Sequence, residues 1–123
     1  MLHYPSDFMH GIRFALGRKQ PFAMHRDASG ALVSLLLPTF GYGIPFWFLE
    51  RALARTGSYA RGQARSTLGR FDVDFRIGDR RFTFISDDMG GAVIRARDRG
   101  DDLEALRAAL IEDGRFVDRT TVT

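Results

Sequence analysis

The stretch 71–86 constrains the fold most, because apolar and polar residues alternate on both sides of a tight turn. A period-two pattern of this kind is typical of strands with one buried face. Gly78-Asp79 in its middle is a two-residue sequence that closes hairpins. The predicted register would place the aromatic residues of both strands on one face of the sheet. It pairs Ile77 with Arg80, Phe75 with Phe82 and Val73 with Phe84.

Residues 92–97 repeat the alternation and predict a third strand that extends this meander. A helix is predicted to follow over residues 102–113 and to cover the sheet. Asp101 followed by Glu104 is a capping-box pattern at its start, and Gly114 is a typical C-terminal stop. The apolar stripe of this helix consists of Leu103, Leu106, Leu110 and Ile111.

The N-terminal half predicts a second group of helices and strands. Residues 6–17 favour a helix, although Ile12, Phe14 and Leu16 also alternate as they would in a strand. Residues 22–26 and 31–37 flank a turn-rich tetrad and predict a β-hairpin. Pro45 suits the first residue of a helix that runs to about residue 56. The polar stretch 58–69 then predicts a connector or mobile loop.

These elements predict a single α+β domain over residues 1–123. The expected sheet is antiparallel, has about five strands in a hairpin and a three-stranded meander, and is packed by about three helices in the order α-β-β-α-β-β-β-α. The chain has no cysteine, which excludes disulfides and thiolate metal sites. Its start shows no pattern of a secretory signal, and a cytoplasmic location is expected.

An uncharged run at residues 31–49 carries the most unusual composition in the chain. Its prolines and glycines favour a strand, a loop and a helix over a membrane span. Phe46, Trp47 and Phe48 cannot all be buried on one helix face, because successive residues project about 100° apart. The N-terminal helix, a protein partner or a second copy of the chain could cover the remainder.

The sequence therefore favours a non-catalytic protein-interaction domain that has an inhibitor, immunity or chaperone-like role or that associates with itself as a homodimer. No cofactor is expected, and an enzymatic role is the less favoured alternative because no known catalytic motif occurs. The predicted partner-binding residues are Tyr42, Phe46 and Trp47, with Arg51 and Arg55 at the polar rim.

Arginine placement supports nucleic-acid binding as an alternative function. Residues 1–70 hold nine Arg and Lys against three Asp and Glu, whereas residues 71–123 hold nine Arg against twelve acids. This asymmetry could steer an acidic partner to the first half. Basic side chains along one face suit a phosphate backbone. The predicted band comprises Arg51, Arg55, Arg61, Arg65 and Arg70.

A third hypothesis is a small enzyme or metal-binding protein that uses Asp87 and Asp88. The other aspartate group, at residues 98–102, lies beyond the following strand and could not share a metal with them. Adjacent aspartates before two glycines are more often turn formers. His3, His10 and His25 are interpreted as surface or half-buried residues.

Overall fold

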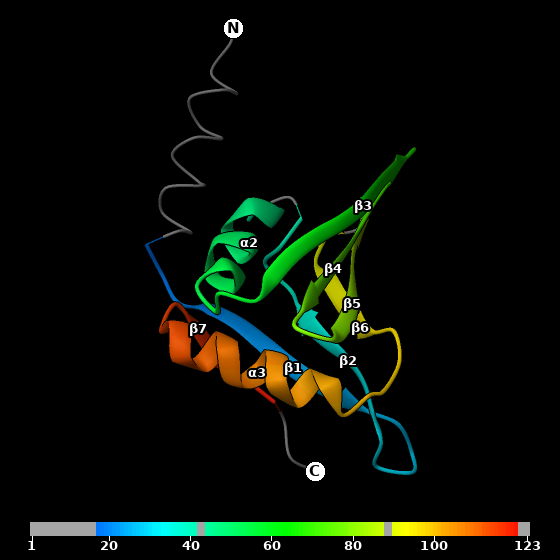
Figure 1. Ribbon diagram of the computed structural model, residues 1–123, viewed down its shortest axis with the longest axis vertical. Helices are drawn as coiled ribbons and strands as arrows, with labels where there is room; N and C mark the ends of the chain where they lie inside the picture. Colours follow the sequence, from blue (N-terminus) through cyan, green and yellow to red (C-terminus); the bar gives the residue numbers. More distant parts are fainter. Residues whose placement is uncertain (1–16, 42–43, 88–89, 121–123) are drawn as a thin grey trace, which may run out of the picture.

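The computed structural model describes residues 17–41, 44–87 and 90–120, which form one mixed seven-stranded sheet and two helices (Figure 1). The strand order is β3-β4-β5-β6-β2-β1-β7. Neighbouring strands are antiparallel except β1 and β7, which run parallel. The strands are β1 (Gln20–Arg26), β2 (Leu32–Leu37), β3 (Tyr59–Thr67), β4 (Arg70–Ile77), β5 (Arg80–Asp87), β6 (Ala92–Ala96) and β7 (Phe116–Asp118).

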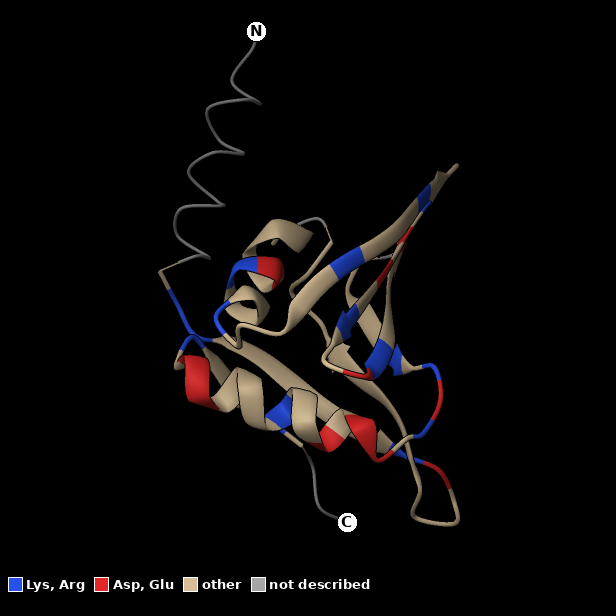
Figure 2. Cartoon of the chain, in the orientation of Figure 1, with Lys and Arg blue, Asp and Glu red and all other residues tan. Residues whose placement is uncertain are grey.

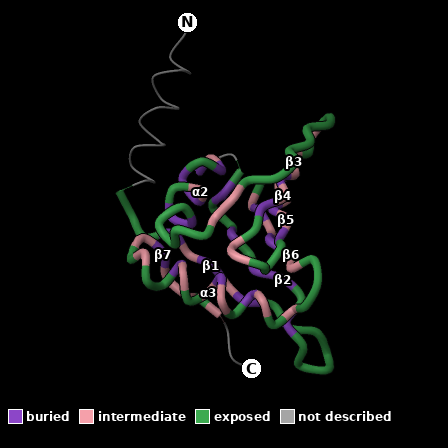
Figure 3. Tube along the Cα trace, viewed as in Figure 1, coloured by how far each residue is buried: buried purple, intermediate pink, exposed green. Residues whose placement is uncertain are grey.

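Both helices, α2 (Phe46–Ala54) and α3 (Asp102–Asp113), pack against the same side of the sheet, here called the inner face. Alternate strand residues point to this side and are buried with the helices in a single core cluster. Phe22, Leu35, Phe82 and Ile94 are fully buried there. The outer face carries the intervening residues, most of which are partly or fully exposed, although Ser34 on β2 is buried (Figure 3).

The β4–β5 hairpin confirms the predicted register at every pair. Ile77 lies opposite Arg80, Phe75 opposite Phe82 and Val73 opposite Phe84. The rings of Phe75 and Phe82 stack with centroids 5.3 Å apart on the inner face. Gly78 has a φ of +61°, a backbone conformation that favours glycine and explains why the turn forms there.

Residues 58–69 are not a connector, and this prediction was wrong. Most of them form β3, a nine-residue strand at one edge of the sheet. Nearly all of its side chains are exposed, so burial imposes no period-two pattern on its sequence. Backbone pairing with β4 holds it in place instead, with a register irregularity between Arg61 and Ala64.

The strand β7 at the opposite edge was also missed. Its three residues follow α3 and pair with β1 in parallel, which makes the sheet mixed and not purely antiparallel. So short a segment lacks an alternation that could predict it. Residues 6–16 of the predicted helix lie outside the described ranges, and residue 17 is in a turn. Two helices are described where about three were expected.

The predicted helix over 102–113 is confirmed as α3, but not its capping box. Asp101 has φ −62° and ψ −21° and makes no side-chain capping hydrogen bond. A capping residue needs an extended backbone for its side chain to reach the first free N–H groups, and Asp101 is already helical in conformation. Gly114 ends the helix with a φ of +86°, as predicted. Ile111 is 45% exposed and does not belong to the buried stripe.

Helix α2 begins one residue after Pro45, close to the predicted start, and ends at Ala54. Neither of the described helices has the length and apolarity that a membrane crossing requires.

Candidate functional site

The aromatic residues at the start of α2 divide between the core and the surface. Phe46 and Phe48 are buried, whereas Trp47 between them is 44% exposed. The sheet covers both phenylalanines. The ring of Phe46 lies 4.8 Å from that of Phe84, and the ring of Phe48 lies 5.9 Å from that of Phe116, between centroids. Phe46 thus leaves little surface for a partner to contact. Of the predicted aromatic residues that the structure describes, Trp47 is the one exposed to solvent.

Arg51 lies one helical turn after Trp47 and shares its side of α2. Its guanidinium carbon is 6.0 Å from the centroid of the Trp47 ring, within the range of a cation–π contact. Arg51 is exposed and forms no ion pair with any carboxylate in the described ranges. The pair therefore offers an aromatic surface and an uncompensated cation side by side.

Arg55 lies at the end of the same helix and is fixed by α3. Its guanidinium is 3.2 Å from the carboxylate of Asp113, which Arg115 also binds at 2.7 Å. The Asp113 side chain is only 1% exposed. The hydrogen bond from Arg115 lowers the pKa of this carboxyl, so Asp113 stays charged and holds both arginines. Arg55 is thus a bound member of the predicted rim.

The position predicted for Tyr42 lies outside the described ranges. The described residues on either side of it are hydrogen-bonded: the Gly41 N–H donates to the Ile44 carbonyl at 2.9 Å, and the Ile44 N–H donates to the Thr39 carbonyl at 3.0 Å.

The predicted arginine band does not form one continuous surface. Arg61 points to the inner side, where it binds Glu50 through two contacts of 3.0 and 3.2 Å. Arg65 points to the outer side and binds Asp74 with two hydrogen bonds of 3.1 Å. The register irregularity between these arginines is what turns them to opposite faces. A single phosphate backbone would not follow both.

Internal carboxylates compensate most of this band. Arg70 binds Asp72 at 2.8 Å, and Arg55, Arg61 and Arg65 have the carboxylate partners described above. Arg51 is therefore the one member of the band that has no carboxylate partner in the described ranges. Most of these acids come from the second half of the chain. Acids of the second half thus form ion pairs with four arginines of the first half, Arg26, Arg55, Arg65 and Arg70. Figure 2 shows basic and acidic segments on neighbouring strands.

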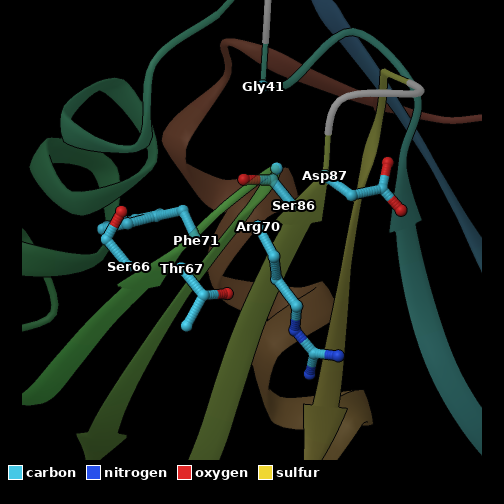
Figure 4. A pocket seen from close by; sticks show the side chains of 8 residues that line it. Gly41, Ser66, Thr67, Arg70, Phe71, Ser86 and Asp87 are labelled. Carbon is cyan, nitrogen blue, oxygen red and sulfur yellow. The ribbon is translucent and has the colours of Figure 1, made fainter.

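Asp87 lines a hollow of about 320 Å³ at the ends of β3, β4 and β5 (Figure 4). Ser66, Phe71 and Ser86 form one cross-strand row in this hollow, and Gly41 closes its side. In Figure 4 the Asp87 carboxylate and the Arg70 guanidinium point in different directions, and neither is directed at the Ser86 hydroxyl. The hollow thus brings Gly41 close to Ser86 and Asp87, and the charged groups of Arg70 and Asp87 do not converge in it.

The remaining acidic and histidine predictions have simple outcomes. Asp88, His3 and His10 lie outside the described ranges, and His25 is exposed on β1. Asp98 and Asp102 form ion pairs with Arg81 and Arg80. In the part of the chain that the structure describes, no three His, Asp or Glu side chains are placed to share a metal ion.

One group of arginines was not singled out in the sequence. Arg76, Arg81, Arg95 and Arg97 gather on the outer face of β4, β5 and the end of β6. The predicted hairpin register contained the signal, since pairing Ile77 with Arg80 also sets Arg76 directly opposite Arg81.

No protein-family model, curated protein or solved structure matches this chain.

Proposed function

We propose that this chain is a non-catalytic protein-interaction domain whose partner covers the Trp47 side of α2. The observation that carries the proposal is the 44% exposure of Trp47 beside the guanidinium of Arg51, which has no carboxylate partner among the described residues. Tryptophan and arginine are the residues most enriched at the energetic centres of protein interfaces. Both lie on a regular helix, which presents them without the ordering cost of a loop.

The rim of this surface supports the same proposal. Arg55 is held by Asp113, so its guanidinium is oriented before a partner arrives. Exposed, oriented polar groups around an aromatic anchor are the usual arrangement of an interface. The partner is either a second copy of the chain or another protein, for which inhibitor, immunity and chaperone-like roles are the proposed classes. We propose that the chain acts in the cytoplasm, as its sequence predicts.

Two variants test the surface. Trp47→Ala removes the exposed ring, and Ile111→Ala removes a side chain of nearly equal exposure, 45%, from α3. Self-association is measured first, by light scattering of the full chain over a concentration series. We expect wild type and Ile111→Ala to dimerise alike and Trp47→Ala to lose at least tenfold in affinity, as for an interface anchor.

If the wild type is monomeric, the same three chains serve as baits and retained proteins are then purified and titrated individually. The supporting result is a purified protein that binds wild type and Ile111→Ala equally and Trp47→Ala at least tenfold more weakly. The proposal fails if no protein, the chain itself included, loses affinity when Trp47 is removed.

A further inference from the structure

The outer face of the sheet concentrates arginines where β4, β5 and β6 meet. Arg76 and Arg81 are direct cross-strand neighbours, an arrangement that is unfavourable for two like charges. Arg95 on β6 and Arg97 just beyond it alternate along the chain and so share a face. Arg97 lies next to Arg81, because its N–H donates to the Arg81 carbonyl at 2.8 Å. Figure 2 shows the basic segments on these strands.

A hollow of about 240 Å³ lies among these side chains. Arg76, Arg81 and Arg97 line it together with Asp74 and with Gly62, which lies at the register irregularity of β3. A Cβ at Gly62 would lie 3.2 Å from the carbonyl oxygen and 3.3 Å from the Cβ of Asp74, so a larger residue would push β3 against Asp74 beside the hollow. The glycine at the irregularity therefore allows the close approach of β3 to β4 at the edge of this hollow.

The carboxylates near the hollow are already engaged. Asp74 accepts two hydrogen bonds of 3.1 Å from Arg65 and one of 2.9 Å from Thr83. Asp98 is bound by Arg81. These contacts leave two guanidinium groups poorly compensated.

Arg97 reaches the shared Asp74 only at 3.4 Å. The Arg76 side chain donates to the Gly78 carbonyl and has no carboxylate partner in the described ranges. Cations held together in this way, on a rigid sheet and with incomplete compensation, attract an anion.

We propose that this hollow binds a phosphate group through Arg76 and Arg97, with Arg81 beside them. Guanidinium groups match phosphate oxygens with paired N–H donors, and a tetrahedral dianion offers acceptors to several of them at once. A bound phosphate also supplies the anionic partner that Arg76 lacks among the described residues. The site is independent of the proposed partner surface, which lies on α2 at the other side of the sheet.

The test uses the full chain and isotope-labelled arginine, with the Nε–Hε resonances followed by NMR while inorganic phosphate is added at constant ionic strength. We expect saturable shifts at Arg76 and Arg97. Arg76→Gln should weaken binding about tenfold or more, because it removes charge-assisted hydrogen bonds. Arg119→Gln is the matched control, since Arg119 is exposed after β7 at the opposite edge of the sheet. Gly62→Ala should also weaken binding, without any change of charge.

Further titrations identify the source of the phosphate. Adenosine monophosphate tests a small ester, and a short single-stranded DNA tests a polymer backbone. Saturable binding of inorganic phosphate or the monophosphate that depends on Arg76 supports the site. The proposal is overturned if acetate binds as tightly as phosphate, if Arg76→Gln binds phosphate like wild type, or if only DNA binds.

Discussion

The inner face of the sheet carries phenylalanine rings that two helices cover, whereas the outer face carries arginines and aspartates that no described helix covers. Buried apolar area is the main favourable term in folding, so the inner face should supply most of the stability. The ion pairs of the outer face are partly solvated and each contributes little. This difference leaves the outer charges available for binding at small cost to the fold.

Two adjacent residues of β5 test the comparison most directly. Phe84 is 1% exposed on the inner face, where its ring centroid lies 4.8 Å from that of Phe46, while Ile85 is half-buried on the outer face. Phe84→Ala should lower the free energy of unfolding by about 3–5 kcal/mol, because it leaves a cavity in the core. Ile85→Ala should lower the free energy of unfolding by only about 1 kcal/mol.

Urea unfolding of the two variants, followed by the fluorescence of Trp47, the only tryptophan, gives both values. Equal losses of unfolding free energy in the two variants would mean that both faces of the sheet contribute alike to stability, which would contradict the expected difference between them.

The network around Asp74 gives the next largest effect. The hydrogen bonds from Arg65, followed by that from Thr83, lower the pKa of this carboxyl below its ordinary value of 3.8. A lowered pKa in the folded state stabilises the protein above pH 3.8, and this contribution is lost as the pH falls through the folded-state pKa. Asp74→Asn should therefore lower the free energy of unfolding by about 1 kcal/mol at neutral pH, and by progressively less below pH 3.8.

Urea unfolding of wild type and Asp74→Asn across this pH range measures that difference. Asp101→Asn is the control, because Asp101 is exposed and makes no side-chain capping hydrogen bond. If the loss of unfolding free energy in Asp74→Asn stays constant with pH, the side chain of Asp74 stabilises the fold by its shape and not by its charge.

The same contrast explains which elements the sequence could predict. The β4–β5 register follows from alternation and the Gly78 turn, because one face of both strands is buried. The strand β3 has no buried face, so its residues carry no such pattern and read as a loop. The strand β7 depends on a distant partner, β1, which local sequence cannot indicate.

The candidate sites divide in the same way. The exposure of Trp47 could be anticipated, because helix geometry forbids burying three consecutive aromatic residues on one face. The pairing of Arg65 with Asp74 could not, because it requires β3 to be a strand and to carry the irregularity that turns Arg65 outward. Tertiary register, not residue type, decides which arginines are compensated.

The smallest effect is expected at Leu68, in the turn that joins β3 to β4. Its side chain is fully exposed, so Leu68→Ser should remove little packing from the described chain. The free energy of unfolding should change by no more than about 0.5 kcal/mol. Leu37→Ser is the matched control, since Leu37 is completely buried and should lose several times as much. Urea unfolding at two protein concentrations separates the outcomes. If Leu68→Ser lowers the free energy of unfolding by an amount that grows with protein concentration, this turn lies in an interface between copies of the chain. The end of the hairpin would then contribute to stability as the buried core does.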